Sequence, residues 1–147
     1  MFYGEYRHAV DEKGRLIMPS RLRLCMKDNY IDKFFITRGL EKCLFAFTER
    51  EWTQLEQKFK ALPITQGNAR AFGRILFSGA FLADCDKQGR INIPQHLLNY
   101  AGIEKEVVVV GVSTRIEIWN LNSWDNFVAE SLDSYEKTAE AFVDLGI

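Results

Sequence analysis

Long apolar segments are missing from this 147-residue sequence. No run approaches the roughly 20 apolar residues that a membrane-spanning helix needs, so we expect no membrane partner. The first residues, MFYGEYRHAVDEKGR, contain no uninterrupted apolar stretch and carry acidic residues early, which argues against a secretory signal. The sequence therefore predicts a cytoplasmic protein.

Cysteine and histidine are scarce. The three cysteines, Cys25, Cys43 and Cys85, form no CxxC pair and have no histidine at ligand spacing, so we expect free thiols and no metal site. The two histidines, His8 and His96, occupy unrelated positions, and the sequence motifs of serine hydrolases, P-loop enzymes and metalloproteases are absent. These absences predict a protein that is not an enzyme and uses no cofactor and no small-molecule substrate.

A strong net charge is also missing, although the charges are unevenly distributed. The formal net charge is −1, with 47% hydrophobic and 27% charged residues, a balance typical of a globular protein. Residues 1–23 hold five basic and three acidic residues, whereas residues 120–147 hold one basic and six acidic residues. Binding responds to the local field, so the acidic C-terminal segment can mask a basic surface in the total.

Two segments of the sequence repeat each other. Residues 11–23 read DEKGRLIMPSRLR and residues 86–98 read DKQGRINIPQHLL, so Asp, Gly, Arg, Pro and Leu recur at a shift of 75 positions. Further along, the shift becomes 72 and pairs Gly39 with Gly111 and Trp52 with Trp124. Agreement over such different residue types indicates an internal duplication.

Each copy predicts the same succession of elements. FYGEYRHAV alternates as a half-buried strand does, DEKGR supplies a turn, RLIM returns, and Pro19 opens a short helix. FFITRG and CLFAF form a second strand pair, and GAFLADC, INI, PQHLLNYAG, EVVVVGV and IEIW are the matching pieces of the second copy. TEREWTQLEQKFKAL and the segment 121–145 are closing helices with one apolar face, and GNARAFGRILFS is a helix between the copies.

The predicted organisation follows from the size of each copy. We expect residues 1–62 to form the first repeat with its closing helix, residues 63–77 a connecting helical segment, and residues 78–147 the second repeat. Half of a small barrel of short strands buries too little core to be stable alone. The sequence therefore predicts an α+β fold, a small pseudo-two-fold barrel of two halves that is flanked by helices, with the C-terminal helix packed on the core.

The repeated turn carries the candidate functional residues. Asp11, Gly14, Asp86 and Gly89 are explained by the needs of the turn backbone. Arg15 and Arg90 are not, because an exposed ion pair contributes only about 0–1 kcal/mol to stability, whereas a guanidinium held by an aspartate is preorganised for phosphate or guanine. Further candidate DNA contacts are Lys13, Lys87 and Arg7.

The second copy is poorer in cations than the first. His96 and Leu98 replace Arg21 and Arg23, and Leu82 replaces Arg7, so we expect the two halves to bind DNA unequally. Arg38 and Arg115, at the second strand pair of each copy, are interpreted as solvated turn charges.

YGEYRHAVDEKGRLIMPSRLR and SGAFLADCDKQGRINIPQHLLNYAGIEKEVVVVGVSTRIEIW closely resemble the MraZ family, a tandem version of the AbrB-like (SpoVT-AbrB/MazE-type) swapped-hairpin domain. The resemblance covers nearly the whole chain and both copies of the D-x-x-x-R motif. It implies a nucleoid-associated, sequence-specific DNA-binding transcriptional regulator of the division and cell-wall gene cluster. Such proteins bind short repeats in promoter DNA as ring-shaped homo-oligomers. The resemblance assigns the DNA contacts to Arg15 and Arg90, with Lys13 as a helper.

Two other classes of function are open to the sequence. Asp11 with Arg15 could suggest a phosphate-transferring enzyme, but no nucleophile accompanies them, and a deep pocket beside the motif would distinguish that class. A protein-binding scaffold or antitoxin-like module is the second alternative. Antitoxins usually carry a polar disordered arm, whereas residues 121–145 are patterned as an amphipathic helix.

Overall fold

The two copies fold into the same order of elements, as the computed structural model shows for residues 1–146. The strands are β1 (Glu5–Ala9), β2 (Arg15–Ile17), β3 (Lys33–Arg38), β4 (Leu44–Phe47), β5 (Phe81–Asp84), β6 (Arg90–Asn92), β7 (Glu106–Val112) and β8 (Arg115–Asn120). The helices are α1 (Ser20–Asp28), α2 (Glu49–Lys60), α3 (Gly67–Ser78), α4 (Gln95–Tyr100), α5 (Leu121–Asp133) and α6 (Tyr135–Glu140), with short 3-10 turns at Leu40–Lys42 and Val143–Leu145. The predicted α+β class is confirmed.

The copies exchange their first strands. β1 of the first copy pairs with β7 of the second, β5 of the second pairs with β3 of the first, and β4 pairs with β8, all antiparallel. The resulting six-stranded sheet has the order β1-β7-β8-β4-β3-β5, which is unchanged when equivalent strands of the two copies are interchanged. The pairing therefore shows the internal pseudo-two-fold relation, and neither copy completes its sheet without the other.

The predicted barrel differs from the observed sheet, which is open. β1 and β5 stay at its edges, while β2 and β6 pair with each other as a separate two-stranded ribbon. In the first copy, one isolated bridge between Val10 and Leu16 joins the two sheets. The chain reverses at Asp11. The backbone hydrogen bonds there, from Asp11 to Arg15 and from Gly14 to Asp11, lie within the turn and do not continue the pairing of β1 into β2, so the sheet does not close into a barrel.

The core lies between the large sheet, the ribbon and helices α1 and α4. It includes Leu16 and Ile91 of the ribbon, Leu22 of α1 and Leu97 of α4. β7 is buried on both faces, because Val107 and Val109 join this core while Val108 and Val110 meet a second cluster around Trp119. The uninterrupted apolar run of β7 is typical of a strand covered on both sides.

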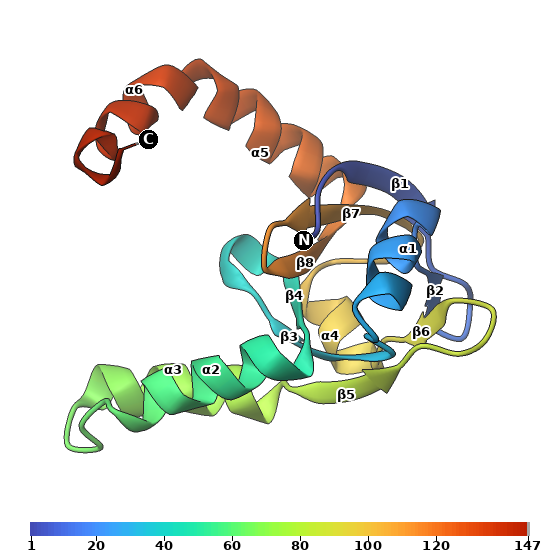
Figure 1. The fold of residues 1–147 in the computed structure, drawn as a ribbon, viewed down its shortest axis with the longest axis horizontal. Coiled ribbons are helices and arrows are strands. Elements are labelled where there is room, and N and C mark those ends of the chain that lie inside the picture. The colour runs from blue at the N-terminus through green and yellow to red at the C-terminus, as the bar shows by residue number, and fades with distance from the viewer. Residues whose placement is uncertain (147) are drawn as a thin grey trace.

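Helices α2 and α3 form a helical hairpin that extends away from the sheets (Figure 1). Thr48 caps α2 by accepting a hydrogen bond from the amide of Glu51. Trp52 is buried and stacks on Phe35 of β3 with ring centroids 5.0 Å apart, which fixes the base of the hairpin to the sheet. The predicted helices in both segments are confirmed, and the Leu62-Pro63-Ile64 segment is the exposed tip between them.

The C-terminal segment differs from the prediction of one helix packed on the core. The helix is broken at Ser134, and only its first turns pack on the sheet, through Trp124 and Phe127 against Trp119. Beyond that point α5 and α6 leave the body of the molecule (Figure 1). Leu132 is 64% and Tyr135 is 69% exposed, so the apolar face of this segment lacks cover within residues 1–146. The apolar cluster on this face of the sheet includes Leu121 and Trp124 of α5 but no later residue of that helix, so the later turns have no core to pack against.

Candidate nucleic-acid interface

The two D-x-x-G-R turns have the same hydrogen-bond pattern. In the first, Oδ1 of Asp11 accepts the amide hydrogens of Lys13 and Arg15 at 2.9 Å each, and Oδ2 accepts Nε–H of Arg15 at 2.7 Å. In the second, Asp86 accepts the equivalent amides of Gln88 and Arg90 at 2.9 Å each and Nε–H of Arg90 at 2.8 Å. Each aspartate thus closes its own turn and fixes the arginine that follows it.

The glycine of each turn has a positive φ, +79° at Gly14 and +81° at Gly89. A Cβ on Gly14 would lie 2.8 Å from the carbonyl oxygen of Ile93, so a larger residue meets both strain and a backbone clash. The same glycines tie the copies together, since the amide of Met18 donates to Gly89 and that of Ile93 donates to Gly14, both at 2.8 Å. The turn of one copy is therefore seated on the segment that follows the ribbon strand of the other.

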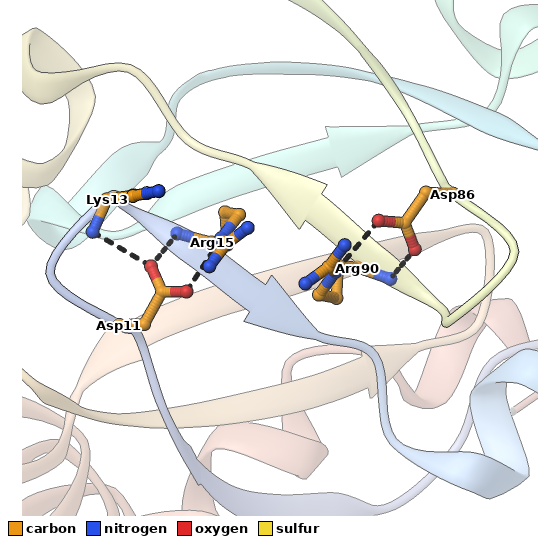
Figure 2. A network of polar contacts seen from close by, with 5 residues as sticks. All are labelled: Asp11, Lys13, Arg15, Asp86 and Arg90. Carbon is orange, nitrogen blue, oxygen red and sulfur yellow. Dashed lines mark hydrogen bonds and ion pairs between the residues drawn. The ribbon is translucent and has the colours of Figure 1, made fainter.

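The ribbon presents both arginines on one outward face. Leu16 lies opposite Ile91 in the β2–β6 register, and both are fully buried. Neighbouring residues of a strand point to opposite faces, so Arg15 and Arg90, which are diagonal neighbours across the ribbon, share the other face. Figure 2 shows the two arginines side by side on the antiparallel strands, between their aspartates.

The arginines are accessible at this position. The side chains of Arg15 and Arg90 are 37% and 32% exposed, and Ile17 and Asn92 complete the same outward face. Only Nε of each arginine is engaged by an aspartate; within the part of the chain that the structure describes, the terminal amino groups have no hydrogen-bond partner. Two guanidinium groups are thus held in place with their outer N–H groups available.

The turn geometry changes the acidity of the aspartates. The amide hydrogen bond from Arg15, followed by its guanidinium hydrogen bond, holds the pKa of Asp11 below its usual value. Asp86 has a lowered pKa for the same reasons, with the amide of Arg90 as the largest cause. Both aspartates therefore stay ionised at neutral pH and keep the arginines in position.

The other predicted contacts are distributed differently. Lys13 and Lys87 lie in the two turns and are exposed, so they border the arginine pair. Arg7 does not join them, because its guanidinium forms an ion pair with Asp125 of α5 at 2.9 Å, which also raises the pKa of Arg7. Four of the five predicted basic residues therefore lie on the ribbon or in its two turns, and the fifth is paired with the C-terminal helix.

Arg38 and Arg115 are not solvated turn charges. Nη1 of Arg38 donates to the carbonyl oxygen of Ile75 at 2.7 Å, which attaches α3 to β3. Arg115 forms an ion pair with the buried Glu117 at 2.7 Å and lies over the ring of Phe45. Both arginines are structural. Ile75 is 37 positions from Arg38, and Glu117 is buried with Trp119 on the face of β8 opposite the main core, so the repeat alone does not identify these partners.

A hollow of about 460 Å³ borders the second turn, between α1 and the segment around Cys85. It is an open groove whose lining contains neither histidine, and burial raises the pKa of the Cys85 thiol, which leaves it a poor nucleophile. Among residues 1–146, no three His, Cys, Asp or Glu side chains converge as a metal site would require. None of the helices described is long and apolar enough to cross a membrane.

Comparison with known families matches this chain twice. The model of the family described as "MraZ protein, putative antitoxin-like" matches residues 1–75 and again residues 76–145. The two matches together cover almost the entire sequence, and each contains one copy of the D-x-x-G-R turn.

Proposed function

Because the chain belongs to the MraZ family, whose members are regulatory rather than enzymatic, we propose that it is a sequence-specific DNA-binding transcriptional regulator that contacts double-stranded DNA through the β2–β6 ribbon. The observation that supports this proposal is the pair Arg15 and Arg90, each held by an aspartate, side by side on one exposed face. A two-stranded antiparallel ribbon is narrow enough to enter the major groove of B-DNA.

The geometry of each arginine suits base recognition. The aspartate holds Nε, and the outer N–H groups remain free to bind O6 and N7 of guanine as a bidentate pair. Each such pair discriminates against a wrong base by about 1–3 kcal/mol. In this proposal Lys13 and Lys87, exposed in the two turns, contact phosphates, which makes binding depend on salt.

The proposed target is a set of short direct repeats in the promoter of the division and cell-wall gene cluster, bound by a ring of subunits in the cytoplasm at the nucleoid. Two projecting segments support self-assembly. The α2–α3 hairpin exposes Ile64 and Ile75 and carries five basic and three acidic residues within 49–78, while the C-terminal segment is acidic and exposes Leu132 and Tyr135. Opposite charge around uncovered apolar side chains favours head-to-tail contacts between copies, which close into rings.

Assembly explains how a chain with a net charge of −1 can bind DNA. A second subunit tethered to the same duplex sees an effective concentration of order mM, so weak single contacts combine. Local cations on the ribbon, repeated around a ring, replace the strongly basic surface of a monomeric DNA-binding domain.

The test of the ribbon is the variant Arg15→Ala, measured by fluorescence anisotropy on a duplex from immediately upstream of the chain's own gene. We expect the loss of specific binding, at least a hundredfold when several subunits engage the duplex at once, with an unchanged circular dichroism spectrum. Lys42→Gln, which removes an exposed cation from the 3-10 turn between β3 and β4, is the control and should retain binding. Unchanged affinity of the Arg15→Ala variant would refute the ribbon as the interface.

A protein-binding scaffold or antitoxin-like module is the second candidate, and the uncovered apolar face of α5 and α6 favours it. If the protein is such a module, its affinity for the promoter duplex and for a scrambled duplex should be the same in the anisotropy experiment. A preference for the promoter duplex that depends on Arg15 decides for the regulator.

A further inference from the structure

The sequence and the structure assign the same basic residue to different halves of the molecule. In the sequence, Arg23 belongs to the first copy, and its equivalent in the second copy is Leu98. In the structure, helix α1 follows β2 across the ribbon and begins beside the turn of the second copy. Arg23 therefore lies over Gly89, where a Cβ on the glycine would be 2.5 Å from Nε and 2.8 Å from Cζ of the arginine.

The equivalent position over the first turn is apolar. Leu98 of α4 lies over Gly14, with its Cδ1 at 3.5 Å from the position of a Cβ there, and belongs to the buried core. Arg23 is exposed. The exchange that builds the pseudo-two-fold fold thus places a cation over one turn and a core residue over the other.

The turns themselves differ in the same direction. The first contains the acids Asp11 and Glu12 beside Lys13 and Arg15, so its charges balance. The second contains one acid, Asp86, beside Lys87 and Arg90, because lysine replaces the glutamate. With Arg23 added, the second turn is the more basic of the two, contrary to the prediction from the order of residues along the chain.

The guanidinium of Arg23 is not committed to another partner. Within residues 1–146 it forms no ion pair and no side-chain hydrogen bond. Lys27 and Lys87 line the same groove as Arg23. The acidic residues that line this groove are Asp32 and Asp86, and Asp86 is already paired with Arg90. The guanidinium thus lies against the backbone of Gly89, next to the residue at which ribbon strand β6 begins.

We propose that Arg23 is a phosphate-binding residue of the second turn, so that this turn, rather than the first, supplies the larger electrostatic share of DNA binding. The inference rests on the proposed function, since it assumes that DNA lies on the β2–β6 ribbon. It adds to that function an asymmetry between the copies. The two arginines read bases in the same way, but the second turn binds the phosphates more strongly than the first. A glycine is then required at position 89 for two reasons: its φ is positive, and Arg23 approaches its backbone too closely to leave room for a side chain.

The experiment compares Arg23→Leu, which copies the residue of the other half, with wild type, using fluorescein-labelled promoter and scrambled duplexes at several KCl concentrations. A lost phosphate contact lowers the slope of log K against log [KCl] by about 0.9 for each engaged subunit. We expect affinity to fall roughly threefold to tenfold per engaged subunit, to a similar extent on both duplexes, because phosphates carry no sequence information. Arg15→Ala, in contrast, should weaken the promoter duplex far more than the scrambled one.

Three further variants keep the outcome interpretable. Arg23→Lys preserves the charge and should retain most of the salt slope, whereas a merely structural role for the guanidinium would leave this variant as weak as Arg23→Leu. Arg23→Gln is a second neutral variant, to be used if thermal unfolding shows that leucine disturbs the fold. Lys42→Gln, in the 3-10 turn between β3 and β4 and away from the ribbon, removes the same charge and should change neither slope nor affinity.

The failures of the two proposals are distinguishable. If Arg15→Ala abolishes specific binding while Arg23→Leu leaves affinity and slope unchanged, the role of Arg23 is refuted and the ribbon stands. An Arg23→Lys variant as weak as Arg23→Leu also refutes the phosphate contact. If the wild-type protein does not distinguish the promoter from the scrambled duplex and shows no salt dependence, both proposals fail together.

Discussion

At the scale of the residue, the aspartate of each turn controls an arginine through both of its oxygens. Oδ1 fixes the backbone of the turn and Oδ2 fixes the guanidinium, so one carboxylate orients the residue that we propose to read DNA. The arrangement is repeated in the second copy within 0.1 Å for each of the three hydrogen bonds. An arginine held this way loses less conformational entropy on binding than a free side chain does.

Because the aspartates hold the turns as carboxylates, the stability of the turns depends on pH. The pKa values of Asp11 and Asp86 are lowered in the folded protein, so their contribution to stability is full above the pKa of an unfolded aspartate, about 3.9, and is lost as pH falls through the lower folded-state values. We expect the thermal midpoint of wild type to fall between about pH 4 and pH 2. The double variant Asp11→Asn/Asp86→Asn should show a shallower decline in differential scanning fluorimetry. An identical decline in both proteins would mean that the turn aspartates do not contribute to acid sensitivity.

At the scale of the element, helix α5 consists of a first part that packs on the sheet and a second part that does not. Its first turns are anchored, because Trp124 and Phe127 pack against Trp119 with ring centroids 5.3 Å and 5.0 Å apart, and the indole N–H of Trp124 donates to Glu5. Its later turns project from the molecule. The sequence shows one amphipathic pattern through both segments and does not mark where the sheet ends.

The difference between these segments is measurable. Trp124→Ala removes an aromatic side chain from a partly buried cluster and should lower the free energy of unfolding by about 1–3 kcal/mol. Leu132→Ala, at a position that is 64% exposed, should change it by less than about 0.5 kcal/mol. Urea unfolding followed by tryptophan fluorescence for the second variant, and by circular dichroism for both, gives the two values. Equal destabilisation would show that the outer turns of α5 are covered in solution.

The sequence predicts most elements of this fold because each has its own local signal. The turn residues locate the chain reversals that follow β1 and β5, apolar alternation locates the strands, and GNARAFGRILFS corresponds to α3 (Gly67–Ser78). What local signals do not contain is which copy a strand or helix meets. The exchange of β1 and β5, and with it the position of Arg23 over Gly89, depends on long-range pairing. For the same reason the sequence placed Arg7 with the turns, whereas a residue 118 positions away, Asp125, binds it.

At the scale of the whole molecule, duplication produces similar but unequal halves. The geometry of the arginine held by an aspartate is kept in both copies, while the surrounding charges, the helix lengths and the projecting segments differ. A strict dimer of identical halves would present the same surface on both sides of its axis. The tandem chain instead carries a basic hairpin of helices on one copy and an acidic helical tail on the other, so a surface of one molecule can fit a different surface of the next.

That polarity leads to a prediction about assembly. Replacing Leu132 and Tyr135 with glutamate adds charge to exposed apolar positions, so the folded subunit should keep its stability while the proposed head-to-tail contacts weaken. Mass photometry should show the oligomer of wild type replaced by smaller species. Binding to a promoter duplex with several repeats should fall steeply, whereas binding to a duplex with one repeat should fall little, because only the former depends on tethered second contacts. Leu24→Glu, at an exposed apolar position on α1, is the matched control for added negative charge in assembly measurements. A double variant that keeps the mass of the wild-type oligomer would exclude the C-terminal segment from the contacts between subunits, and the uncovered face of α5 and α6 would then need another partner.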